Sequence, residues 1–425
     1  MPVVLKKPGS IKNVGIISTR IAGTDGVSLE IKKWADVLEK NGFNCFYFGG
    51  ELDRDDRFCY ACELAHFKHP DIDKITQWVF GSTTRSITVS NFIKKVKVEL
   101  KRALYAFIKE FNIDLIIPEN VLSIPMNIPL GLGITECIAE LSIPTIAHHH
   151  DFSWERERFL ISACEDYLRC AFPPDLRCIR HVVINSLASK QLNYRLGISN
   201  TVIPNVYDFT HPPQTAEKKN SELKQMIGLT EDDLFILQPT RIVPRKSIER
   251  SIEIVSGLNL PNPTLVISHA SGDEGNDYFQ RINEHAHSLG VNITVIDHLI
   301  SPRVHRSNAS DDLSTITELY QSADMVTYPS TYEGFGNAFL ETIYFKKPII
   351  VNRYPVFIAD IEPKGFDVLA FDGFVTAKII SQIQALLDDK KRKKEMVDKN
   401  YKLAQLYFSY EILEKKLIYL INTLV

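Results

Sequence analysis

The sequence is poor in the features that mark membrane and secreted proteins. Its 425 residues contain no run of about 18 apolar residues, the length of a transmembrane helix. The first residues lack the charged, apolar and small-residue regions of a signal peptide. The seven cysteines are odd in number and scattered, which is typical of reduced thiols. We therefore expect a cytoplasmic protein that does not associate with membranes.

An excess of positive charge is also absent. The net charge of -3 leaves no basic surplus for a nucleic-acid-binding surface, so we expect no nucleic-acid partner. Residues 92–111 combine an apolar stripe with several basic residues, which we interpret as a packed helix with a solvated basic face. An anionic ligand would have to be held by a few local cations.

What is present is the composition of a folded globular protein, with 44% apolar and 24% charged residues. A chain of 425 residues is too long for one ordinary core, so we expect two domains of roughly 200 residues each. Residues 14–18 form a short apolar run, residues 23–26 a glycine loop, and residues 27–40 have helical spacing. Another apolar run at 45–48 completes a β-α-β unit of a parallel sheet.

Apolar runs of strand length recur along the rest of the chain. They occupy residues 115–117, 145–147, 182–184, 235–237, 265–267, 293–296, 325–327 and 349–351. Residues 210–220 are proline-rich and then charged, without apolar periodicity, and we place the domain linker there. The sequence thus predicts an α/β protein with two Rossmann-like, doubly wound domains facing a cleft, residues 1–208 and residues 209–404. A helical tail at 405–425, after a break near Ser409, is expected to cross back to the first domain.

In open α/β sheets, ligands bind beyond the carboxyl ends of the strands. After the predicted strand at 235–237, Arg241 and Lys246 stand on a turn that enters a helix. Two fixed cations near the start of a helix suit a diphosphate. A lone arginine and lysine would more simply be solvated surface charges, so the interpretation depends on the residues that come after the other strands.

A loop with two glycines comes after the predicted strand at 325–327. Gly334 and Gly336 let backbone amides approach an anion or a sugar closely. Glu333 stands in this loop and Glu341 stands about one turn into the next helix, so the two carboxylates can accept hydrogen bonds from different parts of one extended ligand. The alternative interpretation is a helix-capping glutamate and a surface glutamate.

Taken in order, these motifs resemble glycosyltransferase family 4, whose members have the GT-B architecture and an E-x7-E motif with Gly-Phe-Gly inside it. The resemblance covers nearly the whole chain, because residues 23–26 match the family's first glycine loop and residues 204–205 match its interdomain Pro-Asn. Thr240 and Ser247 replace common glycines, and Val206 replaces another. The resemblance implies a donor-binding set of Gly23, Gly26, Arg241, Lys246, Glu333, Gly334, Phe335, Gly336, Asn337 and Glu341, with His298 near the base.

Polar residues also come after the predicted strand at 145–147. His148 and His150 point to the same side if the strand continues. Neighbouring histidines could bind a metal ion, but zinc usually takes ligands from separate elements, so we expect no metal site. The resemblance places His150 beside the anomeric carbon of the transferred sugar, as a catalytic residue with Arg241, Lys246 and Glu333. We assign acceptor binding to Thr24, Asp25, Glu119, Asn120, Asp151 and Arg156.

The resemblance implies a retaining hexosyltransferase that needs no divalent metal or other cofactor. Its partners would be a nucleotide sugar and a small hydroxylated acceptor, with Arg241 and Lys246 neutralising the leaving diphosphate. Residues 18–30, 148–156 and 238–246 are similar to a subgroup that moves mannose from GDP-mannose to glucosylglycerate, a compatible-solute synthesis. That acceptor has a carboxylate, for which five arginines are available: Arg20, Arg54, Arg57, Arg85 and Arg156.

Three alternatives share parts of this pattern. Another transferase of the same family would use UDP-glucose in the synthesis of sucrose phosphate, trehalose or a glycolipid. A non-catalytic protein would bind the sugar nucleotide without turnover, which the complete set of Arg241, Lys246, Glu333 and Glu341 argues against. A dinucleotide oxidoreductase would need a G-x-G-x-x-G turn, which residues 23–26 do not provide.

Overall fold

The computed structural model describes residues 11–23, 25–213, 220–270, 277–296 and 310–424. It divides into two compact units. The first unit comprises Met1–Asn205 together with Tyr410–Val425, and the second unit comprises Val206–Ser409. The chain therefore passes from one unit to the other twice.

The first unit contains a seven-stranded sheet with the order β3-β2-β1-β4-β5-β6-β7. Its strands are β1 (Asn13–Ile17), β2 (Asn44–Gly49), β3 (Cys59–Ala61), β4 (Leu115–Pro118), β5 (Thr145–His149), β6 (Ile179–Val183) and β7 (Asn200–Val202). Every pairing is parallel. Because the strand order reverses next to β1, the carboxyl ends of β1 and β4 flank the switch point at which such sheets bind ligands.

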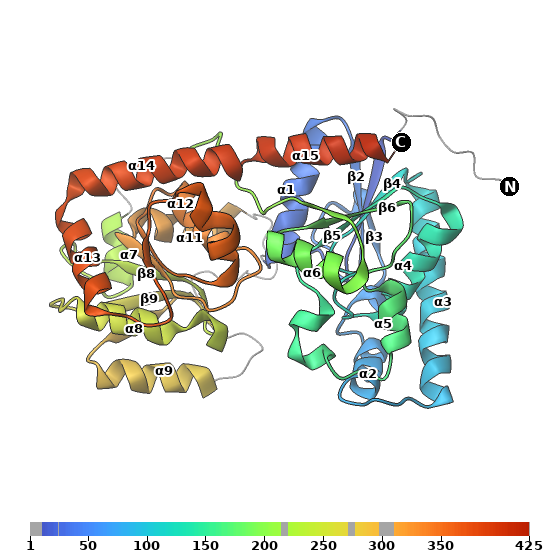
Figure 1. The fold of residues 1–425 in the computed structure, drawn as a ribbon, viewed down its shortest axis with the longest axis horizontal. Helices are drawn as coiled ribbons and strands as arrows, with labels where there is room; N and C mark the ends of the chain where they lie inside the picture. The colour runs from blue at the N-terminus through green and yellow to red at the C-terminus, as the bar shows by residue number, and fades with distance from the viewer. Residues whose placement is uncertain (1–10, 24, 214–219, 271–276, 297–309, 425) are drawn as a thin grey trace. The chain divides into compact units, whose positions relative to one another are not determined.

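Helices cover this sheet, as Figure 1 shows. They are α1 (Gly26–Lys40), α2 (Pro70–Val79), α3 (Ile87–Glu110), α4 (Ile128–Leu141), α5 (Glu165–Ala171), α6 (Ser186–Leu196) and α15 (Tyr410–Thr423). Helix α3 packs against α2 and α4, and α4 packs against α5. A Cβ at Gly15 of β1 would lie 2.8 Å from the ring of Phe107, so glycine is what allows α3 to approach the sheet this closely.

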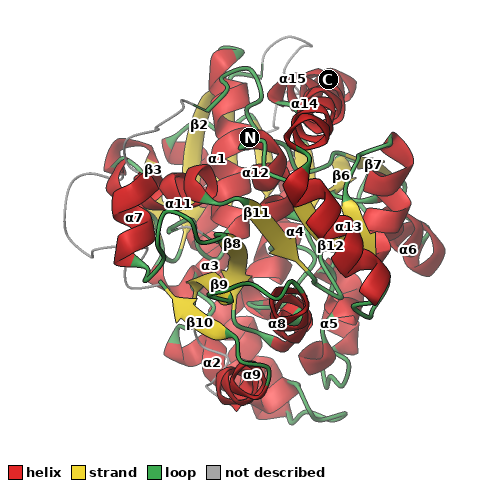
Figure 2. Ribbon diagram, turned by 90° about the vertical axis from the view of Figure 1, so that its left-hand side faces the viewer, coloured by secondary structure: helices red, strands yellow, loops and turns green. Residues whose placement is uncertain are grey.

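The second unit contains a six-stranded parallel sheet with the order β10-β9-β8-β11-β12-β13. Its strands are β8 (Ile236–Arg241), β9 (Thr264–His269), β10 (Asn292–Val295), β11 (Met325–Tyr328), β12 (Ile349–Asn352) and β13 (Leu369–Phe371). Its helices are α7 (Asn220–Met226), α8 (Ile248–Gly257), α9 (Asp277–Ser288), α11 (Ser310–Ser322), α12 (Asn337–Tyr344), α13 (Ala377–Asp388) and α14 (Lys390–Tyr407). Helices α8 and α12 cover opposite faces of the sheet (Figures 1 and 2). Both units are thus doubly wound, as the sequence predicts.

All ten apolar runs lie in or within a residue of a strand, but three strands were not predicted. β3, β7 and β13 have only three residues each and stand at the outer positions of their sheets. β3 follows a charged stretch of the sequence, and its side chains are half-buried or exposed. Strands of three residues are too short to leave a distinct apolar run in the sequence, even in β13, where two of the three side chains are buried.

The helical tail is broken at the predicted place. Helix α14 ends at Tyr407 and α15 begins at Tyr410, and Ser409 between them pairs with Tyr207 in an isolated parallel bridge. Helix α15 belongs to the first unit and packs on α1. The Lys416 ammonium donates to the Val202 carbonyl oxygen at 2.7 Å, which fixes α15 beside the edge strand β7.

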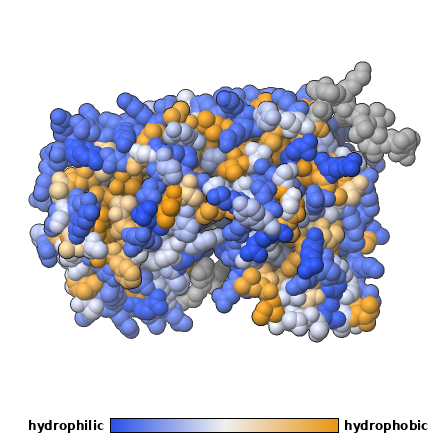
Figure 3. Space-filling model, in the orientation of Figure 1, coloured by the Kyte–Doolittle hydropathy of each residue, from blue (hydrophilic) through white to orange (hydrophobic). Residues whose placement is uncertain are grey.

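Two of the basic residues of α3 are paired with carboxylates of its neighbour α4. Lys97 and Lys101 form ion pairs with Glu136 of α4, and Lys101 also pairs with Glu140 at 2.5 Å. The face drawn in Figure 3 mixes hydrophilic and hydrophobic residues. Among the described residues, no helix combines the length and the apolarity needed to cross a membrane. The apolar stripe of α3 is buried, so this helix is packed against the protein, as interpreted from the sequence.

Candidate functional site

Polar residues meet at the carboxyl edge of the first sheet, where β4 and β5 end. The Asn120 amide donates to the His148 carbonyl oxygen at 2.8 Å, and the Glu119 amide donates to the Ile17 carbonyl oxygen at 2.8 Å. Asn120 adopts a left-handed conformation with φ of 58°, which asparagine tolerates better than most residues. The sharp turn brings Glu119 and Asn120 beside the histidines that come after β5.

Glu119, His148 and His150 form a buried cluster. The His148 Nδ1 lies 3.0 and 2.9 Å from the two carboxylate oxygens of Glu119, and the His150 Nε2 lies 3.2 Å from Oε2. The Glu119 side chain is fully buried, while the His150 side chain is 11% exposed. The Trp34 ring of α1 stacks on His148 with the ring centroids 4.2 Å apart. The predicted alternation is confirmed, because His148 and His150 share one side of the strand.

The charges of this cluster are set by burial and by the carboxylate. Burial opposes ionisation of Glu119, but His148 and His150 outweigh it and lower the pKa of this carboxyl to about 2. Burial lowers the pKa of His148. Burial acts the same way on His150, yet the Glu119 carboxylate, with Glu30 and Asp151 nearby, raises the pKa of His150 above its ordinary value. The carboxylate form of Glu119 and the protonated form of His150 therefore favour each other.

The same three side chains are of kinds that bind metal ions, and one potential ligand atom of each lies within 4.8 Å of the other two. The distances between them are those of N–H···O hydrogen bonds, so one proton on each facing histidine nitrogen satisfies both oxygens of Glu119. We therefore describe the cluster as hydrogen-bonded. The absence of a metal requirement stays a prediction.

His149 points to the other side of β5, where it meets a fourth histidine. Its Nε2 lies 2.9 Å from Nδ1 of His181 on β6, and both side chains are buried. Burial lowers the pKa of His181 to about 4 and holds the pKa of His149 well below its ordinary value. The two rings are therefore a neutral pair that packs the sheet, away from the Glu119 cluster.

Asn120 and Asp151 join this edge to the loop after β5. The Asn120 side-chain amide donates to Asp151 Oδ1 at 3.0 Å, and its oxygen accepts from the His150 backbone N–H at 3.0 Å. Arg156 donates through Nε to Asp151 Oδ2 at 2.6 Å. Asp151 is only 7% exposed. Of the predicted acceptor residues, the structure thus brings Glu119, Asn120, Asp151 and Arg156 together.

The described residues of the glycine loop after β1 bond to neighbouring parts of the first unit. Gly23 has a φ of 76°, which favours glycine, and its amide donates to Asp53 Oδ2 at 2.7 Å. Asp25 caps α1 by accepting from the amides of Val27 and Ser28, and it pairs with Arg20 at 2.9 Å. Gly26 begins that helix. Thr24 lies outside the described residues.

In the second unit, Arg241 ends β8 and Lys246 ends a short 3-10 turn, Pro244–Lys246. Arg241 is exposed, whereas Lys246 is 8% exposed. Ser247 comes next in a left-handed conformation with φ of 47°, which explains why glycine is common there in the family. The turn directs the lysine inward and leaves the arginine at the carboxyl edge of the sheet.

Glu333 binds the cations of this turn. Its Oε1 accepts from the Lys246 ammonium, and its Oε2 accepts from Arg245 Nη1 at 3.0 Å. Burial opposes ionisation of Glu333, but Lys246 and Arg245 lower its pKa. Burial also lowers the pKa of Lys246, with Glu333 acting against it. Sequence reasoning missed Arg245, although its place beside Lys246 in the turn is a signal that could have singled it out.

The loop after Glu333 leads into α12. Gly336 has a φ of 124°, and a Cβ there would lie 2.5 Å from the Tyr354 hydroxyl, so the position requires glycine. Phe335 is buried with its ring 5.3 Å from Phe408, which makes its side chain part of the core. Gly334 precedes it, and Asn337 begins the helix. The loop therefore offers backbone groups rather than an aromatic side chain to a ligand.

Glu341 lies about one turn into α12, as predicted. Its Oε2 accepts a hydrogen bond from the Tyr320 hydroxyl at 2.7 Å, and Tyr320 is buried. The tyrosine fixes the carboxylate without neutralising it. His298, the residue predicted to lie near the base, is outside the described residues.

All five arginines considered for an acceptor carboxylate have an acidic partner. The pairs are Arg20–Asp25, Arg54–Asp53, Arg57–Asp55, Arg85–Asp166 and Arg156–Asp151. Arg158 was not considered, and in the part of the chain that the structure describes it has no carboxylate partner. Its guanidinium lies 4.5 Å from the Phe159 ring and 2.8 Å from the Met126 sulfur. It belongs to the loop after β5, beside Arg156 and Asp151.

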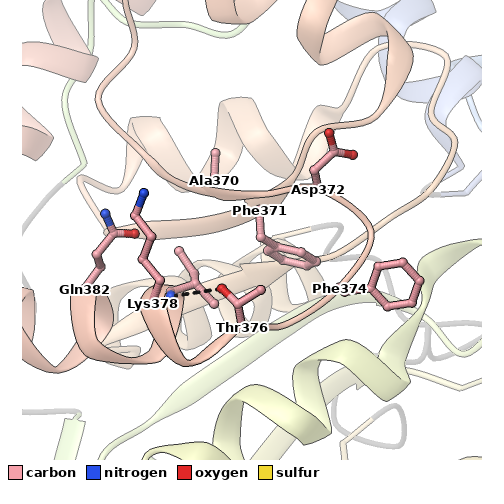
Figure 4. A pocket seen from close by; sticks show the side chains of 8 residues that line it. Ala370, Phe371, Asp372, Phe374, Thr376, Lys378 and Gln382 are labelled. Atoms are coloured by element: carbon pink, nitrogen blue, oxygen red, sulfur yellow. Dashed lines mark hydrogen bonds between the residues drawn. The ribbon is translucent and has the colours of Figure 1, made fainter.

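A separate hollow of about 400 Å³ lies where β13 meets α13. Figure 4 shows the rings of Phe371 and Phe374 there, with Thr376 accepting from the Ile379 amide to cap the helix. The Arg250 guanidinium lies 4.9 Å from the Phe374 ring. None of the predicted site residues lines this hollow, and we assign it no role.

Comparisons with known proteins identify the family of the chain. The model of the family described as glycosyl transferases group 1 matches residues 219–403. A mannosylglucosylglycerate synthase from Thermotoga maritima is 32% identical over 94% of this chain and 97% of that protein. One from Petrotoga mobilis is 30% identical over 84% of this chain and 86% of that protein.

The fold has close counterparts among solved structures. A glycosyltransferase from Rickettsia africae matches 98% of this chain and 99% of that chain with a TM-score of 0.70 at 13% identity, which shows the shared GT-B fold. With relatives of about one-third identity along most of its length, the chain belongs to the group 1 glycosyl transferases, the type of family 4.

Proposed function

We propose that this protein transfers mannose from GDP-mannose to a hydroxyl of glucosylglycerate, with retention of anomeric configuration and without a divalent metal ion. The proposal is carried by the likeness, along most of the chain, to two proteins named mannosylglucosylglycerate synthase. The geometry of each unit supports a role for its residues in such a transfer.

The second unit is suited to the nucleotide diphosphate. Arg245 and Lys246 pair with a single carboxylate, Glu333, and Arg241 lies close enough to Lys246 to influence its ionisation. The three cations and one carboxylate leave a surplus of two positive charges. That surplus would offset the two negative charges of the diphosphate in the bound sugar nucleotide, and Arg241 is already exposed at the edge of the sheet. Cations fixed before the reaction stabilise the charge that develops as the leaving group departs. Glu341, held by Tyr320, is our candidate for the ribose hydroxyls.

The first unit is suited to sugars and to an acid. His150 contacts the transferred sugar in this proposal, and Asn120 and Asp151 hold the loop that carries it. We infer that Arg158 binds the acceptor carboxylate. Arg156 would have to leave Asp151 to bind an acid, whereas Arg158 has no ion pair among the described residues that would have to break. The Phe159 ring beside the Arg158 guanidinium helps to fix its orientation.

The transfer breaks the bond between the anomeric carbon and the diphosphate oxygen and forms a bond from that carbon to the acceptor oxygen. The anomeric carbon passes through an oxocarbenium-like state. In the retaining course, the acceptor attacks from the face that the diphosphate leaves, and a phosphate oxygen takes the acceptor proton. Because Arg241 and Lys246 supply the positive charge, we propose that no divalent metal is needed.

The test is an incubation of the purified chain with EDTA and each of GDP-mannose, GDP-glucose and UDP-glucose, with and without glucosylglycerate. Nucleotide diphosphate release, product mass and the anomeric proton coupling would be measured. Release only with GDP-mannose plus glucosylglycerate, with one hexose gained and the donor anomer kept, is the expected result. Release with another pair would keep a transferase and reject these substrates. Tight donor binding with no release would favour a non-catalytic protein.

A further inference from the structure

The two nitrogens of the His150 ring have different surroundings. Nε2 faces inward and lies 3.2 Å from Glu119 Oε2. For Nδ1, the described residues provide no hydrogen-bond partner, and the side chain is 11% exposed. One edge of the ring is thus fixed by a buried carboxylate, and the other is left for a ligand.

His148 determines which groups carry protons in this cluster. Its Nδ1 lies 3.0 and 2.9 Å from the carboxylate oxygens of Glu119, so this nitrogen is the donor. Its Nε2 is buried and has no partner among the described residues, which fits a neutral ring without a proton there. Trp34, stacked on the His148 ring, opposes a flip that would exchange the nitrogens. Glu119 then uses its remaining hydrogen-bonding capacity on His150.

The charged groups that face His150 come from three elements. Glu119 comes after β4, Glu30 lies on α1, and Asp151 comes after β5. Glu30 is itself paired with Lys33, and Asp151 is paired with Arg156, so Glu119 is the carboxylate committed to the histidines. This surplus of negative charge favours the protonated form of His150.

We propose that Glu119 is a positioning residue that holds His150 as an imidazolium, with Nε2 turned inward and the Nδ1–H presented to an oxygen of the bound sugar or diphosphate. The arrangement is that of a buried carboxylate fixing an imidazole for its reacting partner. It makes His150 a hydrogen-bond donor rather than a general base. Only the identity of the ligand rests on the proposed function. In this proposal Glu119 does not contact the acceptor directly, in place of the acceptor-binding role expected from the sequence.

The test needs no substrate. The full chain with 15N-labelled histidine would be titrated by NMR from pH 5 to 9, and His150→Gln would assign the His150 signals. His150 is expected to titrate above the ordinary value of about 6.5. In the nearly isosteric Glu119→Gln variant, its pKa is expected to fall by roughly one to three units, the effect of an opposite charge at this distance.

Two further variants complete the design. Glu30→Gln is the matched control, because it removes another buried carboxylate that makes no hydrogen bond to His150, and a smaller shift is expected. Glu119→Asp keeps the charge and shortens its reach, so an intermediate shift is expected even if Glu119→Gln does not fold. The proposal is overturned if wild-type His150 titrates at or below about 6.5, if Glu119→Gln leaves it unchanged, or if EDTA alters the His148 and His150 signals.

Kinetics provides an independent arm. If the proposed reaction is observed, Glu119→Gln should lower kcat with little change in the KM for the acceptor, and kcat/KM should begin to fall at a lower pH than in the wild type. A raised acceptor KM at unchanged kcat would instead place Glu119 in acceptor binding and overturn the positioning role. Failure of the transfer reaction would reject the proposed substrates, while the NMR titration would still decide the role of Glu119.

Discussion

Arg241 stands exposed at the end of β8, close enough to Lys246 to influence its ionisation. If it stabilises the leaving diphosphate, its loss removes a charge interaction that strengthens in the transition state. Arg241→Ala is expected to raise the barrier to turnover by roughly 2 to 4 kcal/mol. Nucleotide diphosphate release at saturating substrate measures this. Arg57→Ala, which removes an exposed arginine paired with Asp55, should have no such effect. Turnover near the wild-type rate in Arg241→Ala would contradict the role.

Arg158 makes a prediction about specificity. A hydrogen bond to a charged group is worth about 1.5 to 3 kcal/mol, so Arg158→Gln should raise the KM for glucosylglycerate roughly tenfold to a hundredfold. The KM for the nucleotide sugar should hardly change. Arg195→Gln is the matched control, because Arg195 also lies over an aromatic ring, that of Trp154 at 5.3 Å. Equal effects of the two substitutions would show that the acid is not recognised by Arg158.

At the scale of residues, the sequence predicts which side chains belong to the site better than it predicts which side chains they pair with. The transferase site, with Glu333, Lys246 and His150 in it, was predicted from the resemblance of the ordered motifs to glycosyltransferase family 4. The ion pair between Lys246 and Glu333 was not predicted, because the two residues are 87 positions apart in the chain. Whether an arginine is committed to an ion pair, as Arg156 is, or lacks a carboxylate partner, as Arg158 does among the described residues, depends on the folded loop.

At the scale of elements, the length and the burial of a strand together affect whether it can be predicted. The inner strands β4, β11 and β12 are buried on both faces and appear in the sequence as apolar runs. The outer strands β3 and β7 have partly exposed side chains and were missed. The elements that position the candidate site, β4, β5, β8 and β11, are inner strands. The placement of the site was therefore more predictable than the width of either sheet.

The buried His181 of β6, which faces His149 of β5, makes the stability of the fold depend on pH. His181 has a pKa of about 4 in the folded chain because of burial, against about 6.5 when unfolded, so the unfolded chain binds more protons below pH 6.5. Stability from this group is present above pH 6.5 and is lost as the pH falls toward 4. His181→Phe should reduce the loss of unfolding free energy between pH 7 and pH 5 by about 2 kcal/mol.

Urea denaturation of the wild type and the variant at both pH values measures this difference. The comparison is made between variants because His150, with a raised pKa, contributes stability of the opposite sign, present at low pH and lost as the pH rises. An equal pH dependence in the two proteins would mean that His181 is not kept neutral by the fold.

At the scale of the whole molecule, each unit contains a different part of the chemistry. The cations and the two carboxylates of the E-x7-E motif belong to the second unit, and the histidine cluster belongs to the first. The family model matches residues 219–403, within the second unit, whereas the named relatives align along most of the chain. Features of the first unit, such as the Glu119 cluster and Arg158, are therefore where experiments on acceptor choice should begin.

The first unit is completed by the last residues of the chain. Leu413, Leu417, Leu420 and Ile421 of α15 are buried, and the helix packs on α1. Leu417 is fully buried, so Leu417→Ala is expected to cost about 2 to 5 kcal/mol of unfolding free energy. Tyr419→Ala is the control, because that side chain on the same helix is 68% exposed and should change stability by less than about 0.5 kcal/mol.

The unit that loses stability is as informative as the amount. Because α15 belongs to the first unit, Leu417→Ala should lower the urea midpoint reported by Trp34, which is buried in α1, and increase hydrogen exchange in β1 and β2. Hydrogen exchange in β8 and β11 should change little. Faster exchange in the second unit with an unchanged first unit would show that α15 stabilises the second unit, which would contradict its assignment to the first. The expected pattern would establish that a segment more than 200 residues away in sequence is part of the first unit's core.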